Sequence, residues 1–146
     1  MIRAYIVSGR GYLALARGDS LTALRVLAGT KDTLSECWSD NRVTIVRLLV
    51  AAGRYRDAAH RLERRWPGTT SCSNGVDDVL WTMERARVLD RLGQRDDAAT
   101  NYALVMAAWR TADPELQPYV REASTALQRL RRNGAHVLTA SILPTR

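Results

Sequence analysis

Phenylalanine is missing from this chain of 146 residues, and tryptophan and tyrosine together make up only 6% of it. The core must therefore be built mainly from alanine and leucine, which favours closely packed helices over a sheet rich in aromatic and β-branched residues. Cysteine is almost as scarce. Cys37 and Cys72 have no other Cys or His at ligand spacing, so they fit neither a disulfide framework nor a zinc site.

Long apolar runs are also missing. No stretch approaches the roughly 18 apolar residues that a membrane helix needs, and Met1–Arg10 contains no signal-like segment. A chain of this length can form one domain without a disulfide or a bound metal. We therefore expect a soluble, cytoplasmic, all-α domain over residues 1–133, followed by a short tail over residues 134–146.

Lysine is present only as Lys31, although the chain has 22 basic residues, 15 acidic residues and a net charge of +7. The positive charge is concentrated locally, because residues 41–66 alone carry a net +5. A local excess of arginine is compatible with nucleic-acid binding but does not require it.

Apolar residues recur at spacings of three and four from end to end, which is typical of amphipathic helices. The pattern predicts helices over residues 2–17, 20–28, 40–52, 55–66, 77–92, 95–111 and 114–132. We expect Asp113 to cap the last helix, with Pro114 as its first residue. Asn133 and Gly134 are a typical helix stop.

A repeated turn is the clearest pattern in the sequence. A glycine between two predicted helices is followed five residues later by an alanine, in the pairs Gly18–Ala23, Gly53–Ala58 and Gly93–Ala98. Four residues after each alanine stands Leu27, Leu62 or Tyr102. Glycine allows the chain to reverse, and the small alanine allows the two helices to approach closely.

Residues 5–132 resemble a tetratricopeptide repeat (TPR) region, and the three glycine–alanine turns carry that resemblance. Residues 81–130 are similar to the C-terminal repeat regions of bacterial signalling proteins such as serine/threonine kinases. The resemblance implies three antiparallel helical hairpins stacked as a short right-handed solenoid, with a C-terminal capping helix. It also implies a non-catalytic scaffold that binds a protein or peptide in a concave groove.

The resemblance places the groove along the first helix of each hairpin. The sixth residue before each turn glycine faces this groove in TPR domains, and here these residues are Tyr12, Arg47 and Arg87. Tyr5, Val43 and Met83 precede them on the same faces. Two arginines and a tyrosine predict an acidic or carboxylate-bearing partner. We expect replacement of either arginine by alanine to weaken binding and barely change the melting temperature.

No residues in the chain form a recognisable catalytic, phosphate-binding or metal-binding motif, so we expect no enzymatic activity and no cofactor. Glu84 and Arg87 have the spacing of an ordinary helix ion pair. The alternative function is nucleic-acid binding by a helix-turn-helix whose reading helix is the arginine-rich segment 55–66. A repeat explains more residues, because the same turn recurs without the arginines.

The first predicted helix has nothing before it to cover its outer face. We expect this face to be closed by a partner, by self-association, or by a further part of a longer protein.

Overall fold

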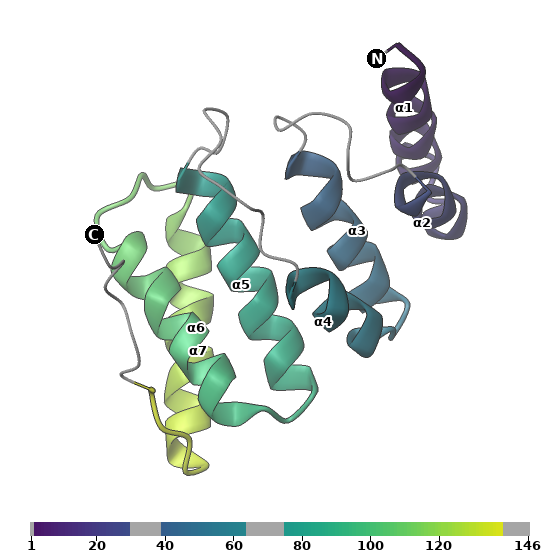
Figure 1. The fold of residues 1–146 in the computed structure, drawn as a ribbon. Coiled ribbons are helices and arrows are strands. Elements are labelled where there is room, and N and C mark those ends of the chain that lie inside the picture. The colour runs from purple at the N-terminus through teal and green to yellow at the C-terminus, as the bar shows by residue number, and fades with distance from the viewer. Residues whose placement is uncertain (1, 30–38, 64–74, 139–146) are drawn as a thin grey trace, which may run out of the picture. The chain divides into compact units, whose positions relative to one another are not determined.

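The computed structural model describes residues 2–29, 39–63 and 75–138, and within these ranges it contains helices and turns but no strand. The helices are α1 (Ile2–Ala16), α2 (Ser20–Ala28), α3 (Ser39–Ala51), α4 (Tyr55–Glu63), α5 (Gly75–Arg91), α6 (Arg95–Ala108) and α7 (Gln117–Arg132) (Figure 1). The all-α prediction is therefore confirmed, and each predicted helix is found in its place. None of the helices in the described ranges has the length and apolar content of a membrane-spanning helix.

The three predicted turns share one backbone geometry. Gly18, Gly53 and Gly93 adopt φ values of 79°, 72° and 75°, the left-handed region that glycine tolerates best. In each turn the glycine N–H bonds the carbonyl three residues back, and the next N–H bonds the carbonyl five residues back. These two bonds form a Schellman motif, which ends one helix before the next begins two residues later.

The residues after each turn also repeat their environment. The alanines five residues after the glycines, Ala23, Ala58 and Ala98, are completely buried. The apolar residues four positions further on are also buried, with Leu27 at 0%, Leu62 at 2% and Tyr102 at 3% exposure. The sequence repeat therefore corresponds to a turn geometry and a burial pattern that recur in the helix pairs α1–α2, α3–α4 and α5–α6, which are called hairpins below.

The chain divides into two compact units, residues 1–77 and residues 78–146. In the first unit, α1 packs on α2, α3 packs on α4, and α2 also packs on α3. The first helices of its two hairpins are joined by a buried hydrogen bond, in which Asn41 Nδ2 donates to Ser8 Oγ over 2.8 Å.

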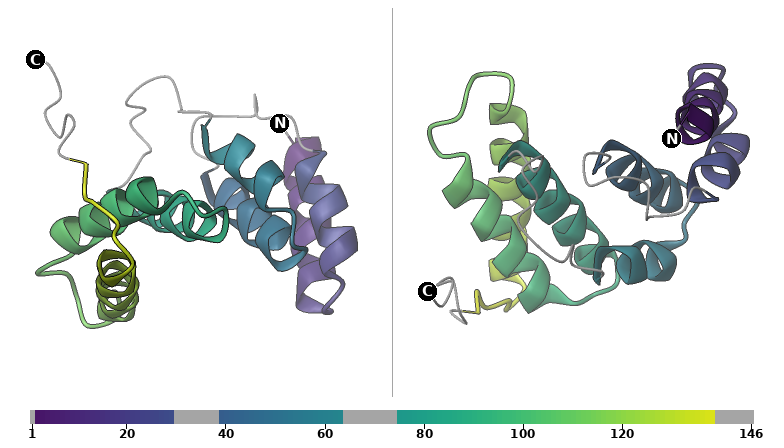
Figure 2. Two further views of the ribbon diagram at one scale, coloured as in Figure 1. Left: turned by 90° about the horizontal axis from the view of Figure 1, so that it is seen from below. Right: turned by 45° about the horizontal axis from the view of Figure 1, so that its top comes forward.

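In the second unit, α5, α6 and α7 surround one core, and the views in Figures 1 and 2 place these three helices together. Each helix contributes small and large apolar side chains. The buried members are Met83, Ala86, Leu89, Ala98, Ala99, Tyr102, Val105, Trp109, Ala123, Leu127, Leu130 and Ala135. The helix α7 thus covers the core of the α5–α6 hairpin.

The start of α7 differs from the prediction. The helix begins at Gln117, with Pro118 in its first turn, so Asp113 is not its cap and Pro114 is not its first residue. Residues 113–116 instead form a turn, in which the Leu116 N–H donates to the Asp113 carbonyl. Either proline fits a first helical turn, because proline lacks the N–H that remains unpaired there.

The beginning of the predicted tail packs against α6. Ala135 is buried, the His136 N–H donates to Asp96 Oδ1 over 2.8 Å, and the Leu138 N–H donates to Thr100 Oγ1 over 2.9 Å. Residues 139–146 lie outside the described residues. Contacts with α6 are therefore described as far as Leu138, five residues beyond Asn133.

Gly11 of α1 is buried against the side chain of Leu27 on α2. A Cβ atom placed there would lie 2.5 Å from Leu27 Cδ2, whereas one placed at Gly9 in the same helix would have no neighbour within 4 Å. Gly9 and Gly11 therefore have equal helix propensity and opposite packing environments.

We expect Gly11→Ala to destabilise the protein by about 1–2 kcal/mol, because the overlap with Leu27 outweighs the better helix propensity of alanine. Gly9→Ala is the matched control, and it is expected to stabilise the protein by about 0.5–1 kcal/mol. Urea denaturation of both variants measures the difference. Equal effects of the two substitutions would contradict the packing described here.

Candidate interaction surface

The residues six positions before the turn glycines retain some exposure in both units. In the first unit, Tyr12 on α1 is 37% exposed, and its hydroxyl lies 3.4 Å from Thr44 Oγ1 on α3. Arg47 on α3 is exposed. In the second unit, the side chain of Arg87 on α5 is 28% exposed. Tyr12 and Arg47 thus lie on neighbouring helices of the first unit, and Arg87 is described within the second.

The residues ten positions before the turn glycines are buried, which corrects part of the predicted site. Val43 is 9% exposed and Met83 is 0% exposed, so Met83 presents no surface to a partner. Four residues along a helix of 3.6 residues per turn correspond to a rotation of about 40°. In these helices that rotation is enough to move a side chain from the surface into the core. The side chain of Tyr5 lies outside the described part of the structure.

Arg87 is held by two carboxylates of its own unit. Its Nε and Nη2 donate to Glu122 Oε1 and Oε2 of α7 over 2.7 and 2.6 Å, a bidentate pair. Its Nη1 donates to Glu84 Oε1 over 2.7 Å. The Glu84 side chain is only 3% exposed. The carboxylate recognition expected of Arg87 is therefore fulfilled within the chain, by a residue of the covering helix.

The charges around Arg87 join α5 to α7 at a second point as well. Arg129 of α7 donates to Asp90 of α5, one helical turn beyond Arg87. The Arg87 guanidinium carbon also lies 5.9 Å from the centroid of the Tyr119 ring, within cation–π range. This ring meets Trp109 edge-on, with centroids 5.6 Å apart. Two ion pairs and one cation–π contact therefore join α5 to α7.

Two pKa values reflect this environment. The hydrogen bonds to Glu122 raise the pKa of Arg87, so the guanidinium stays charged under all ordinary conditions. Burial raises the pKa of the Tyr102 hydroxyl, because the phenolate would lose its solvation. Neither shift creates an acid or a base suited to catalysis near neutral pH.

Only one of the two ion pairs of Arg87 could be predicted from the sequence. The spacing of Glu84 and Arg87 predicted their ion pair, and the structure confirms it. The pair with Glu122 joins residues 35 positions apart, and no local pattern in the sequence indicated it.

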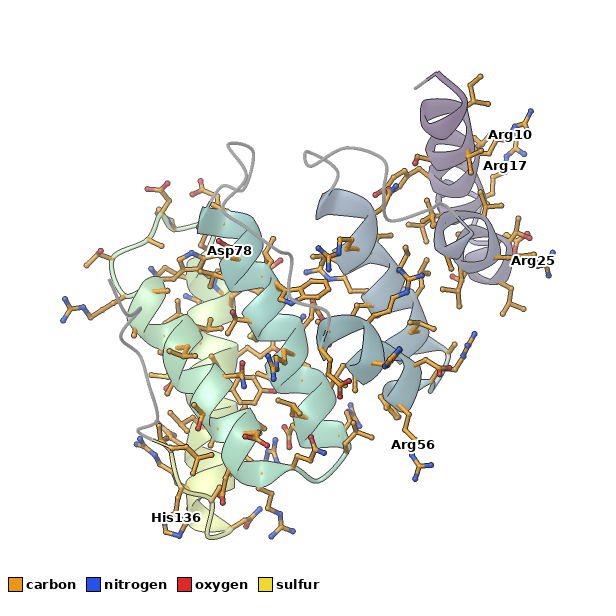
Figure 3. All side chains as sticks on the ribbon, viewed as in Figure 1. Arg10, Arg17, Arg25, Arg56, Asp78 and His136 are labelled. Atoms are coloured by element: carbon orange, nitrogen blue, oxygen red, sulfur yellow. The ribbon has the colours of Figure 1, made fainter. Side chains whose placement is uncertain are left out.

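The arginines of the alternative nucleic-acid interface lie in and around α4. Arg54 Nε donates to Asp57 Oδ2 over 2.6 Å, and Arg61 Nη2 donates to the Ala28 carbonyl over 3.4 Å. Arg56 is exposed at the surface of α4 (Figure 3). Arg64 and Arg65 lie outside the described residues. Two of the three described arginines therefore have partners within the first unit.

Among the residues that the structure describes, no group of three or more His, Cys, Asp or Glu side chains could hold a metal ion. Cys37 and Cys72 both lie outside that part of the chain. Comparison with models of protein families, with curated proteins and with solved structures found no match.

Proposed function

We propose that this chain is a non-catalytic, TPR-like interaction module that binds an acidic segment of a partner protein. The observation that carries the proposal is the turn geometry that recurs three times with the same pattern of burial. In a protein built of repeated hairpins, most apolar side chains pack against neighbouring repeats, and the exposed positions of the repeats form the surface that binds a partner. The resemblance of residues 81–130 supports a role within or beside a bacterial signalling protein.

The first unit offers the more accessible recognition residues. Arg47 and Tyr12 lie on neighbouring helices, and Thr44 lies beside the Tyr12 hydroxyl. An arginine can bind a carboxylate with two parallel hydrogen bonds, and tyrosine supplies apolar contact area together with a polar end. In the second unit the equivalent arginine, Arg87, is less accessible, since only 28% of its side chain is exposed. We therefore place the acidic-partner site on α1 and α3.

Peptides selected from a random library on the full chain provide the test. We expect the enriched peptides to be rich in Asp and Glu, or to end in a free carboxylate. Arg47→Ala is expected to weaken their binding by about 1–3 kcal/mol, because a charge-assisted hydrogen bond is lost. Arg47→Lys is expected to recover only part of this loss, because lysine cannot form the bidentate pair.

Arg56→Ala is the matched control, since Arg56 is an exposed arginine on another helix of the same unit. It should leave the affinity unchanged, and none of these exposed substitutions should move the melting temperature appreciably. Peptides without acidic residues, or equal binding by the parent and Arg47→Ala, would refute the assignment.

A further inference from the structure

The outer side of α1 carries one stripe of exposed apolar and basic residues. Ile6, Arg10 and Leu13 of α1 and Arg17, the residue directly after it, stand at spacings of four, three and four, so they lie along one face. Ile6 and Leu13 are each 50% exposed, and Arg10 and Arg17 are exposed as well. In Figure 3, Arg10, Arg17 and Arg25 project on the side of the α1–α2 hairpin away from α3. This set of residues is called the α1 stripe below.

The second hairpin shows what the same positions do when a neighbour is present. Counted back from the turn glycine, Ile6, Arg10 and Leu13 correspond to Asn41, Ile45 and Leu48 of α3. These three residues are only 7%, 2% and 7% exposed. Asn41 makes its hydrogen bond to Ser8 of the preceding hairpin. The α1 stripe therefore occupies the positions that face a preceding helix, and no described element of the first unit covers it.

The charge of the α1 stripe determines what can cover it. The helix α1 contains no acidic residue. The only acid in residues 2–29 is Asp19, whose carboxylate accepts the Thr22 N–H as the cap of α2. Neither Arg10 nor Arg17 forms an ion pair within the described residues. Moreover, Arg10 stands where α3 has the buried Ile45, so a helix seated here must bring a carboxylate to this point.

We infer that the α1 stripe docks an acidic amphipathic helix of another protein, with two apolar contacts at Ile6 and Leu13 and carboxylates opposite Arg10 and Arg17. A second copy of the chain fits less well, because two α1 helices would bring arginines together. A lipid surface also fits less well, since Arg10 interrupts the apolar stripe that membrane insertion requires. This surface is separate from the Arg47 site of the proposed function.

The test uses the full chain and a fluorescent peptide of about 20 residues, long enough to be helical. The peptide carries leucine at spacings of three and four and glutamate on its flanks. We expect saturable binding that weakens with salt. Leu13→Asp, and separately Arg10→Glu combined with Arg17→Glu, should each weaken it about tenfold or more. A peptide with lysine in place of glutamate should bind the charge-reversed variant better than it binds the parent.

Arg56→Glu and Arg47→Ala are the controls, and both should leave this binding unchanged. Equal loss in Arg56→Glu would show general attraction between opposite charges and overturn the inference. So would the lack of saturable binding up to about 1 mM peptide, the weak end of measurable affinity. Two further results would also overturn it: a dimer in sedimentation that Leu13→Asp dissociates, or binding to anionic vesicles without binding to the peptide. Loss of the Arg47 site alone would leave the α1 stripe intact, so the two proposals fail separately.

Discussion

A chain that ends at Asp113 is expected to lose the folded structure of its second unit. The truncation removes the three α7 side chains that are buried in the core, Ala123, Leu127 and Leu130. Burial of one leucine is worth about 1.5–3 kcal/mol, so their loss, together with the exposure of Tyr102 and Trp109, costs several kcal/mol. That amount is comparable to the whole stability of an ordinary domain.

Amide hydrogen exchange would measure the result, because α5 and α6 should lose their protection in the truncated chain. A chain that ends at Leu138 is the matched control. It keeps α7 and the contacts of His136 and Leu138 with α6, and it is expected to retain protection and melting temperature. If the chain that ends at Asp113 melts at the temperature of the parent, α7 does not have the covering role described here.

The second large effect is expected for Arg87→Ala, with a loss of about 3 kcal/mol of unfolding free energy. The substitution removes one ion-pair partner of the nearly inaccessible Glu84, and it also removes the bidentate contact between α5 and α7. Removal of one partner of a buried ion pair is costly, because the other charge stays in a position that water hardly reaches. The sequence alone predicted almost no change in melting, because it treated Arg87 as an exposed residue of the groove.

Arg91→Ala is the control, since Arg91 is an exposed arginine one turn further along α5, and the change should be within about 0.5 kcal/mol. Glu84→Met combined with Arg87→Met removes both charges and keeps most of the volume. This double variant should be more stable than Arg87→Ala, because it no longer buries the Glu84 carboxylate. Equal melting temperatures for the parent and Arg87→Ala would contradict the assigned pair.

The parts of the fold that depend on neighbouring residues could be predicted from the sequence. Each turn requires a glycine with positive φ and a small alanine after it, and both requirements are visible within ten residues. The start of α7 was predicted wrongly because Pro114 and Pro118 both fit a first helical turn. Local preference could not decide between them.

The candidate site was harder to predict, because its chemistry depends on which helices meet. The ion pair of Arg87 with Glu84 was predicted from their spacing, but its partner Glu122 lies on a helix that reaches it only through the packing of the core. The burial of Met83 could not be predicted from the sequence either. Met83 lies one turn from the partly exposed Arg87 and is fully buried, and only the direction of the neighbouring helices determines this.

The hydrogen bond between Ser8 and Asn41 also limits how the hairpins can be rearranged. In the third hairpin, Trp81 stands at the position of Asn41, so a chain with the α5–α6 hairpin directly after α1–α2 would leave the buried Ser8 hydroxyl without this partner. The side-chain oxygen Oδ1 of Asn41 is itself buried, and no donor among the described residues reaches it. This unsatisfied oxygen reduces stability, and an apolar side chain in its place would not have that cost. A buried polar pair of this kind selects one neighbour over another. The three hairpins share one turn, but their order in the chain is not interchangeable.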